Sequence, residues 1–332
     1  MYKTILFIGL GGAGQRHLRV VKKIIPNAKY IAYRKTFKTP LLTKDFHLDN
    51  TNTIEKKFKI KIYDDIESAY KEKPDLVIVS NPTSFHSDAI IRAAQEGADV
   101  ITEKPGSASL YEAKKVIKVL EKYKSKFLIS YQRRFHPLME EFKKLIENNE
   151  IGDIYNINIK LNSNVKNWHP YEDYRELYAC NNRLGGGVLL TESHEIDLMM
   201  WIFGKPKKIK SKVFQKISLG LDVEDSAVID LFYDKYKMKF NLDFMSKTSE
   251  RIIEIKGEKA SIILDIDNQS MKINPDKKKS YIHKKNINNE KLFEMQLMYF
   301  INSKLNNLNY QQSLIDNIAL IDECKKNAYI QY

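Results

Sequence analysis

The sequence predicts an α/β protein of two domains, and three features carry this prediction. The chain has 332 residues of which 43% are hydrophobic, and single cores stop growing at roughly 250–300 residues. It opens with a strand, a glycine-rich turn and a helix, and strands continue to alternate with helices to about residue 130. A strand-rich segment then covers 207–273. We therefore expect a first domain at 1–130 with a parallel sheet and a second α/β domain at 131–332 with a large sheet.

The glycine-rich turn indicates what the first domain binds. The apolar run Thr4 to Ile8 is followed by the spacing G-x-G-x-x-G and by a helical pattern from Ala13 to Ile25. In that context the first glycine permits the turn, the second lets the backbone approach a pyrophosphate, and the third lets helix and strand pack closely. The phosphates would lie at the amides and positive dipole of the helix N-terminus. This predicts a Rossmann dinucleotide-binding domain whose phosphate-binding residues are Gly9, Gly11, Gly12, Ala13 and Gly14.

The end of the second strand, Lys29 to Tyr33, bears on the choice of dinucleotide. An enzyme that uses NAD usually has an acidic residue there, which binds the ribose 2′-hydroxyl. This chain has Arg34 and Lys35 instead, and both could pair with a 2′-phosphate. We expect NADP(H) to be preferred, with NAD(H) possible; the alternative is that both cations simply face water.

Two later strand ends should border the same cofactor, because ligands bind at the carboxyl ends of parallel strands. Residues 75–80 lead into a loop with Asn81, Pro82 and His86, and residues 99–102 lead into Glu103-Lys104-Pro105. A lysine beside a nicotinamide would be a candidate acid/base group, because burial and nearby positive charge lower its pKa towards working pH. Taken alone, a lysine before proline is an ordinary exposed residue.

The second domain offers three candidate segments for substrate. Arg134, in Gln132 to Pro137, either touches substrate or forms a structural ion pair. The loop Trp168 to Arg175 is dense in aromatic and polar groups, as a sugar site requires, and its His169, Tyr174 and Arg175 are expected in the pocket unless the loop makes an interdomain or subunit contact. A glycine triplet, Gly185 to Gly187, then precedes a helix over 188–203 that carries His194.

The rest of the second domain is predicted from its pattern. Strand follows strand from 207 to 273, and runs such as 226–233 and 251–256 have an apolar face that we expect to be free for another subunit, which favours a homodimer or homotetramer. A Lys-rich loop is expected at 274–289, and helices at 290–304 and 312–327. No zinc motif is evident, because His194, Glu195 and Asp197 lack the facing i, i+4 ligand pattern.

Composition narrows the partners. The formal net charge is +13, from 55 Lys and Arg against 42 Asp and Glu, which indicates either a solvated Lys-rich surface or attraction to anionic substrates such as sugar phosphates and nucleotide sugars. Nucleic acid is a poor fit as a partner, because the lysine clusters at 277–279 and 284–285 lack interleaved stacking aromatics.

No apolar run approaches the ~20 residues needed to span a bilayer, and the N-terminal run ends in glycines rather than a cleavage site. With only Cys180 and Cys324, we expect a cytoplasmic protein.

Four segments in this order resemble one known family. They are Gly9 to His17, Asn81 to His86, Glu103 to Pro105, and Gly185-Gly-Gly-Val-Leu-Leu-Thr-Glu-Ser-His-Glu-Ile-Asp197. Over nearly the whole chain the sequence is similar to the Gfo/Idh/MocA oxidoreductases, the glucose–fructose oxidoreductase and inositol dehydrogenase-like family. The resemblance implies a Rossmann domain, then an α/β domain with an open, mainly antiparallel sheet that covers the active site and often forms the oligomer interface, and a last helix that returns to the first domain.

The resemblance also implies site roles. Lys104 matches the lysine that hydrogen-bonds the reacting hydroxyl, Glu103 its partner near the nicotinamide, and His194 the second acid/base group. Many relatives have Asp where this chain has Thr191, and the interval from there to the histidine is one residue shorter here. This departure removes the expected carboxylate helper of His194, for which Glu192, Glu195 or Asp197 could substitute, although Asp197 could equally be structural.

Together these features predict an NAD(P)-dependent sugar oxidoreductase that exchanges hydride between a nicotinamide and a carbinol carbon, with Lys104 and His194 managing the hydroxyl proton. The loop around residues 171–175 resembles a branch of the family that is associated with surface-sugar biosynthesis. Two alternatives stay open: a hydrolase or epimerase that recycles its dinucleotide without net redox change, and a non-catalytic ligand sensor on the same fold.

Overall fold

The computed structural model describes residues 2–36, 39–169, 171–216, 220–303 and 310–331. The chain divides into two compact units. Unit 1 comprises residues 1–131 and 289–318, and unit 2 comprises residues 132–288 and 319–332. Each unit has its own sheet and its own core.

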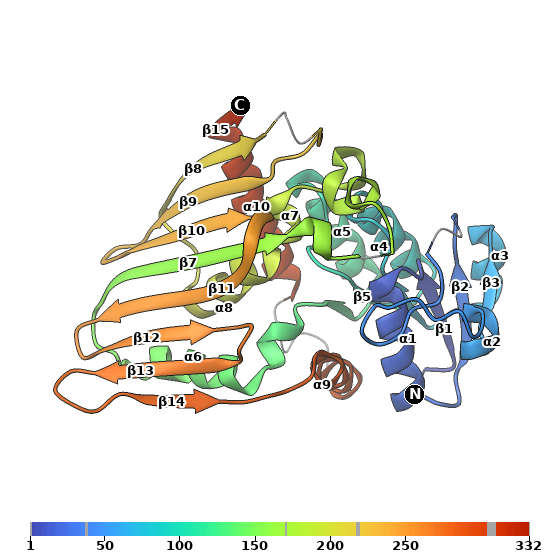
Figure 1. The fold of residues 1–332 in the computed structure, drawn as a ribbon. Coiled ribbons are helices and arrows are strands. Elements are labelled where there is room, and N and C mark those ends of the chain that lie inside the picture. The colour runs from blue at the N-terminus through green and yellow to red at the C-terminus, as the bar shows by residue number, and fades with distance from the viewer. Residues whose placement is uncertain (1, 37–38, 170, 217–219, 304–309, 332) are drawn as a thin grey trace. The chain divides into compact units, whose positions relative to one another are not determined.

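Unit 1 is a Rossmann fold built on a six-stranded parallel sheet in the order β3-β2-β1-β4-β5-β6 (Figure 1). Its strands are β1 (Thr4–Ile8), β2 (Lys29–Tyr33), β3 (Lys61–Tyr63), β4 (Leu76–Val79), β5 (Asp99–Thr102) and β6 (Phe127–Ile129). Its helices are α1 (Gly12–Ile24), α2 (Ile54–Phe58), α3 (Ile66–Tyr70), η1 (Thr83–Phe85), α4 (His86–Gln95), α5 (Leu110–Tyr123) and α9 (Asn289–Asn302). All four residues of β4 are buried, as expected for a central strand covered on both faces.

The strand order places the carboxyl ends of β1 and β4 at the point where the topology reverses. The chain moves from β1 outward to β2 and β3, and returns past β1 to β4. Right-handed crossovers put α1 and α2 on one face of the sheet and α3, α4 and α5 on the other. The glycine-rich turn after β1 therefore lies beside the loop after β4, in the crevice where open α/β sheets bind ligands.

Unit 2 is built on a nine-stranded sheet in the order β14-β13-β12-β11-β7-β10-β9-β8-β15 (Figure 1). Its strands are β7 (Ile154–Asn164), β8 (Lys208–Gln215), β9 (Ser226–Phe232), β10 (Lys237–Asp243), β11 (Met245–Gly257), β12 (Ala260–Asp265), β13 (Ser270–Pro275), β14 (Tyr281–Lys284) and β15 (Ala328–Gln331). The β7–β10 and β8–β15 pairs are parallel, and the other neighbours are antiparallel. The mainly antiparallel sheet implied by the resemblance is thus confirmed.

Helices cover one face of this sheet. They are η2 (Gln132–Phe135), α6 (Pro137–Glu147), α7 (Val188–Thr191), α8 (Ser193–Phe203) and the end of α10 (Tyr310–Lys326), and short 3-10 turns η3 (Val165–Asn167), η4 (Tyr174–Glu176), η5 (Tyr178–Cys180) and η6 (Asn182–Leu184) follow β7. The apolar residues of β9 that face the helices, Ala227, Ile229 and Leu231, are at most 1% exposed. The apolar face that we expected to be free is therefore the buried core face. On the opposite face, β9 contributes Ser, Val, Asp and Phe, and β10 contributes Lys, Asn and Asp. This face is therefore mixed in polarity rather than apolar.

The structure also corrects three element predictions. The Lys-rich loop expected at 274–289 contains β14, a four-residue edge strand flanked by lysines, which keep such an edge from pairing further. The single helix expected over 188–203 is broken at Glu192 into α7 and α8. The chain returns to unit 1 with all of α9 and the first part of α10, whereas the end of α10 lies in unit 2 and leads into β15. Residue 304, the expected end of the first of these two helices, lies outside the described residues.

Within the described part of the chain, no helix combines the length and apolar character needed to cross a membrane.

Candidate active site

The three motif glycines occupy three different environments. Gly9 has φ +94°, and a Cβ there would lie 2.9 Å from the backbone of Ser80 and Asn81. At Gly14 a Cβ would lie 2.5 Å from the carbonyl oxygen of Gly9 and 2.7 Å from Ser80 Oγ. At Gly11 a Cβ would meet no described atom within 4 Å. The first and third glycines therefore let the β1 turn, the β4 loop and α1 pack together, and the space beside the second is open.

The start of α1 presents backbone donors beside that open space. The first α-helical bond runs from the amide of Gln15 to the carbonyl of Gly11 at 2.9 Å, so the amides of Gly12, Ala13 and Gly14 lie before the helical ladder. Gly11, the N-cap, offers no side chain to cap them. These donors and the positive end of the helix fit the phosphates of a dinucleotide.

The loop from 39 to 49 covers the side of Gly12. A Cβ on Gly12 would lie 2.6 Å from the ring of Phe46, and that ring also stacks on Arg16, whose guanidinium carbon is 4.5 Å from the ring centroid. Gln15 fastens this loop to α1, because its side chain donates to Pro40 O at 2.8 Å and accepts from the amide of Leu42 at 2.8 Å. Phe46 was not anticipated, since no periodicity in the sequence placed that loop.

Arg34 and Lys35 have different environments at the end of β2. Arg34 is 6% exposed, and its Nη2 donates to the carbonyl of Thr39 at 2.7 Å. Burial lowers the pKa of Arg34 below its ordinary value, although the nearby Glu55 opposes this. Lys35 is exposed. Arg34 thus also braces the loop at Thr39, while Lys35 extends from the strand end into solvent.

His86 is buried under the loop that follows β4 and hydrogen-bonds its backbone. It is 1% exposed, and its Nε2 lies 2.8 Å from the carbonyl of Asn81, so Nε2 carries the proton and donates. Burial lowers the pKa of His86 to about 4, which keeps the ring neutral near pH 7. His86 therefore braces the loop of Asn81 and Pro82, and its contact with a cofactor stays a prediction.

Glu103 and Lys104 follow β5. The Glu103 side chain is 15% exposed, and its Oε1 lies 2.8 Å from His17 Nε2 on α1. Burial alone would raise the pKa of Glu103, but the hydrogen bond from His17 and the charges of His17, Lys104 and Arg16 hold it below its ordinary value. The side chain before the candidate acid/base lysine is thus a fixed carboxylate, and Lys104 itself is half-buried.

The glycine triplet shapes the start of α7. Gly187 has φ +98°, a conformation that side chains rarely adopt, and a Cβ there would overlap the carboxylate of Glu224. The amide of Val188 donates to the backbone carbonyl of Glu224 at 3.0 Å. Glycine is therefore required at 187 so that α7 can begin directly against the turn before β9.

Thr191 and His194 lie on either side of the helix break. From Thr191 to Met199 every residue is buried except His194, which is half-exposed. Thr191 is 5% exposed at the end of α7. His194 is thus the half-exposed side chain in an otherwise buried stretch, and its catalytic role stays a prediction.

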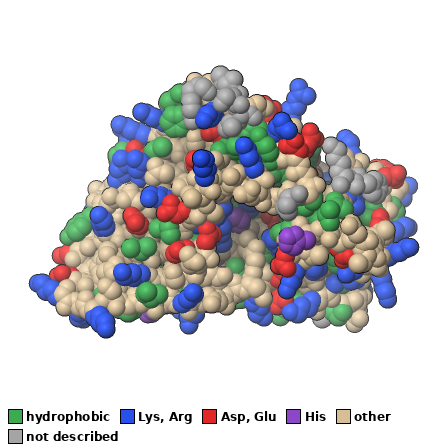
Figure 2. Space-filling model, in the orientation of Figure 1, with side chains coloured by type: hydrophobic (Ala, Val, Ile, Leu, Met, Phe, Trp, Pro, Cys, Tyr) green, Lys and Arg blue, Asp and Glu red, His purple; other side chains and the backbone are tan. Residues whose placement is uncertain are grey.

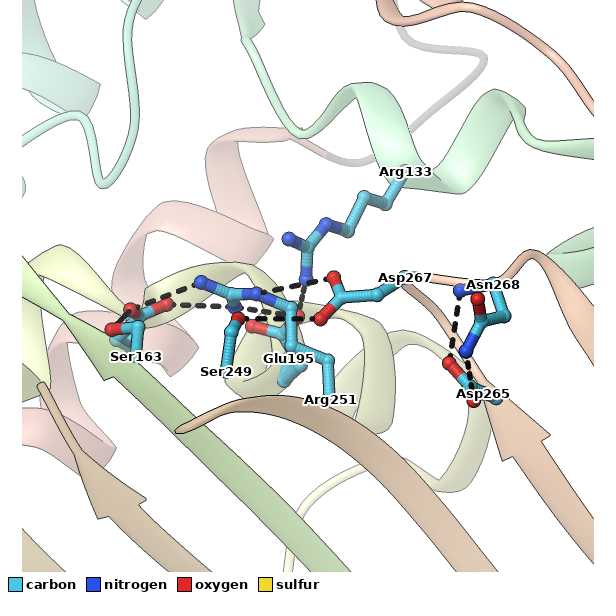
Figure 3. Close-up of polar contacts among 9 residues, drawn as sticks. Arg133, Ser163, Glu195, Ser249, Arg251, Asp265, Asp267 and Asn268 are labelled. Atoms are coloured by element: carbon cyan, nitrogen blue, oxygen red, sulfur yellow. Dashed lines mark hydrogen bonds and ion pairs between the residues drawn. The ribbon is translucent and has the colours of Figure 1, made fainter. Parts of the chain in front are cut away.

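A network of buried charges fixes that break (Figure 3). Arg251 on β11 donates to both carboxylate oxygens of Glu192, at 2.9 and 3.1 Å, and Ser163 on β7 donates to Glu192 at 3.1 Å. Arg251 also reaches Glu195 at 3.3 Å. Figure 3 shows Arg133 pointing from its 3-10 helix towards Glu195, with which it forms an ion pair. Burial and the like charge of Arg251 lower the pKa of Arg133 to about 9.

Arg134 forms the structural ion pair that the sequence left open as an alternative. Its side chain is 4% exposed, and its Nε donates to Asp197 at 2.7 Å while Nη2 binds the other carboxylate oxygen. Asp197 is 1% exposed. The carboxylates considered as helpers of His194 are thus all bound by arginines: Glu192 by Arg251, Glu195 by Arg133 and Arg251, and Asp197 by Arg134.

We expect Arg134→Met to lower the free energy of unfolding by about 3–5 kcal/mol, because it removes the two-pronged ion pair of a buried carboxylate. The double variant Arg134→Met, Asp197→Leu should recover most of that loss, since both charges are then absent. Urea denaturation measures both. Arg92→Met, which removes partly exposed ion pairs with Glu67 and Glu96, is the control and should cost about 1 kcal/mol or less. Equal losses at Arg92 and Arg134 would contradict this account.

The loop predicted to contact substrate makes mainly local contacts. His169 Nδ1 lies 2.6 Å from Glu172, and its ring stacks on Tyr171 at 5.2 Å. Arg175, with 62% of its side chain exposed, forms a fork with Asp173. Tyr174 is half-buried in η4. The positions of His169, Tyr174 and Arg175 in a substrate pocket therefore stay a prediction.

No group of three or more His, Cys, Asp or Glu that could hold a metal ion occurs among the residues with described positions. Unit 1 thus holds a phosphate-binding turn and a lysine that follows a partly buried carboxylate, and unit 2 holds a half-exposed histidine on a braced helix.

Two domains of one known protein family match successive parts of the sequence of this chain. Residues 3–131 match the family described as "Oxidoreductase family, NAD-binding Rossmann fold", and residues 143–320 match "Oxidoreductase family, C-terminal alpha/beta domain". The scyllo-inositol 2-dehydrogenase (NAD(+)) of Bacillus subtilis (strain 168) is 28% identical over 147 residues, which are 44% of this chain and 40% of that protein. The rhizopine catabolism protein MocA of Rhizobium meliloti is 28% identical over 132 residues, which are 40% of this chain and 38% of that protein. These alignments thus span about two-fifths of the length of both relatives.

Two solved structures share the fold. A levoglucosan dehydrogenase in complex with NADH and L-sorbose has a TM-score of 0.79 at 14% identity, over 98% of this chain and 97% of that chain. The WlbA dehydrogenase of Bordetella pertussis, in complex with NADH and UDP-GlcNAcA, has a TM-score of 0.75 at 15% identity, over 98% of this chain and 95% of that chain.

A Rossmann unit with an open phosphate-binding turn, followed by an α/β unit with a mainly antiparallel sheet, defines the class of NAD-binding oxidoreductases. The chain belongs to the Gfo/Idh/MocA oxidoreductase family, since the two family matches together cover most of its length.

Proposed function

We propose that this protein is an NAD(P)-dependent oxidoreductase that transfers hydride between a nicotinamide and a carbinol carbon of a sugar or sugar derivative. The observation that carries the proposal is the glycine-rich turn, where free space beside Gly11 adjoins backbone donors of α1. The residues present fit a dinucleotide: Gly11 to Gly14 would hold the pyrophosphate, and Asn81 and Pro82 border the same crevice. The bound dinucleotide would supply the hydride acceptor or donor.

The protein's own residues would handle the proton. Lys104 would hydrogen-bond the reacting hydroxyl, with Glu103 fixed as a carboxylate beside it, and His194 would be the second acid/base group from unit 2. General acid–base catalysis contributes about 10²–10⁴-fold to such reactions. The arginine-braced break at Glu192 would hold Thr191 and His194 in a defined orientation.

The test is an assay of the protein with NAD⁺ or NADP⁺ and a panel of free sugars, sugar phosphates and nucleotide sugars, in which nicotinamide absorbance and product mass are followed together. We expect reduction of the dinucleotide in a one-to-one ratio with oxidised product. Product without net reduction would instead support the dinucleotide-recycling hydrolase or epimerase, and binding without turnover across the panel would support the ligand sensor.

The choice of substrate class rests on relatives and on charge. One protein of this fold is a levoglucosan dehydrogenase, and another, the WlbA dehydrogenase, was solved in complex with UDP-GlcNAcA. The net charge of +13 favours anionic sugars as substrates. Lys and Arg are scattered among acidic side chains on the face drawn in Figure 2, which does not suit a nucleic acid. Arg175 is the residue of the loop at 168–175 that we assign to a phosphate or carboxylate. A role in surface-sugar biosynthesis is the narrowest form of this proposal.

We expect NADP(H) to be preferred over NAD(H), because no acid follows β2 and two cations do. Replacement of Lys35 by Asp should weaken NADP⁺ binding by about tenfold, the equivalent of about 1.4 kcal/mol, and should leave NAD⁺ binding within about threefold. Arg34→Ala should also weaken NADP⁺ binding, and it frees the carbonyl of Thr39. Fluorescence titration with both dinucleotides measures this, and equal affinities in the wild type would exclude the preference.

We also propose a cellular location and an oligomeric state. Cys180 and Cys324 are both buried free thiols, as suits a reducing cytoplasm. A homodimer or homotetramer would use the mixed outer face of the large sheet rather than its buried apolar face.

A further inference from the structure

A buried chain of hydrogen bonds in unit 1 ends at the carboxylate beside Lys104. His17 Nε2 on α1 lies 2.8 Å from Glu103 Oε1 and 3.4 Å from Ser130 Oγ. Gln296 Nε2 on α9 donates to Ser130 Oγ at 3.1 Å. His17 is 4% exposed, Ser130 is fully buried and Gln296 is 1% exposed. None of these three side chains has a place in the function proposed above.

The geometry fixes the direction of the His17 ring. The ring of Phe293, three residues before Gln296 on α9, packs edge-on against it at 4.9 Å with an interplanar angle of 83°. Because Glu103 only accepts as a carboxylate, His17 Nε2 carries the proton and donates. Phe293 and Ser130, the latter bonded by Gln296, thus contact the imidazole whose N–H points at Glu103.

The charges around Glu103 come from several elements. Arg16 and His17 lie on α1, Lys104 follows directly in sequence, and His86 begins α4; all four interact electrostatically with Glu103. His17 is the neighbour that hydrogen-bonds it. Without that bond, burial would favour the neutral acid.

We propose that His17, supported by Ser130 and Gln296, is a positioning residue that keeps Glu103 ionised and oriented beside Lys104. The same helix α1 begins at the phosphate-binding turn five residues before His17. One helix would therefore bind the dinucleotide phosphates at its N-terminus and orient, through His17, the carboxylate next to the acid/base lysine. This inference rests on the proposed function for its catalytic consequence only.

The first measurement is the titration of Glu103 by ¹³C NMR of labelled carboxylates, assigned with Glu103→Gln. In His17→Leu the Glu103 titration should move to higher pH by about one unit or more, because the favourable hydrogen bond is lost while burial remains. His17→Gln restores a donor at a similar reach and should move it less. Lys23→Met is the control. It removes the ion pair between Lys23, on the same helix as His17, and Glu294 on α9, and it should leave the titration of Glu103 unchanged.

The second measurement is the pH–rate profile. Loss of ionised Glu103 should lower kcat by about 10–100-fold in His17→Leu, with the dinucleotide Kd changed less than about threefold, and the acidic limb should move to higher pH. A merely structural role would lower activity without moving this limb. An unmoved Glu103 titration in folded His17→Leu would overturn the proposal. A wild type without turnover would overturn the proposed function, and the NMR titration would still support or overturn the role of His17.

Discussion

Replacement of Lys104 by Met should lower kcat by about 10²–10⁴-fold, because the hydroxyl of the substrate then loses its acid/base partner. The dinucleotide Kd should stay within about threefold, since the phosphate-binding turn is not altered. His194→Ala should have an effect of similar size, as the half-exposed side chain of an otherwise buried helix start. Steady-state kinetics together with dinucleotide titration measures both variants.

Matched controls separate chemistry from folding. Lys115→Met removes a lysine that lies over Tyr111 on the outside of α5, and His47→Ala removes an exposed histidine; both should keep wild-type kcat. If Lys104→Met and His194→Ala turned over at the wild-type rate, both enzymatic interpretations would lose their assigned residues, and the ligand sensor would remain.

The fold of unit 1 could be predicted from sequence because each signal in it is local. A buried parallel strand is a short apolar run, and G-x-G-x-x-G marks the turn that follows it. The helix break at Glu192 could not be predicted in this way. It depends on Arg251 and Ser163, which lie on strands far from it in sequence, and no local pattern shows that these strands lie beside α7 and α8.

The site shows the same division. Spacing and resemblance predict roles for Gly9 to Gly14, Glu103, Lys104 and His194 because these residues belong to short motifs, and these roles stay predictions. Arg134 was ambiguous in the sequence, because an arginine before a helix serves a substrate or a buried carboxylate equally well, and only its fork with Asp197 distinguishes them. The contacts of Phe46 and His17 were not anticipated, because they join segments separated by a loop or by most of the chain.

Gly11→Ala and Gly14→Ala should separate dinucleotide binding from stability. Gly11 has φ −67°, an ordinary conformation, and its Cβ would enter open space. Gly11→Ala should therefore fold normally and change the free energy of unfolding by about 1 kcal/mol or less, because the gain from replacing a glycine is offset by the poorer N-cap. The added methyl group occupies the approach to the phosphates. Loss of one or two charge-assisted hydrogen bonds, about 1.5–3 kcal/mol each, should weaken dinucleotide binding by roughly 10–100-fold or more.

Gly14→Ala should instead lower stability, because its Cβ would lie 2.5 Å from the carbonyl oxygen of Gly9, which is backbone and cannot move aside cheaply. We expect a loss of about 1–3 kcal/mol or more from such overpacking, and loss of dinucleotide binding with it. Gly97→Ala, at φ +79° on the surface with no described atom near its Cβ, is the control, since it carries backbone strain without a clash and without a ligand nearby. Thermal denaturation with and without dinucleotide gives both quantities. A stable Gly11→Ala that still binds dinucleotide with wild-type affinity would place the phosphates elsewhere than at this turn.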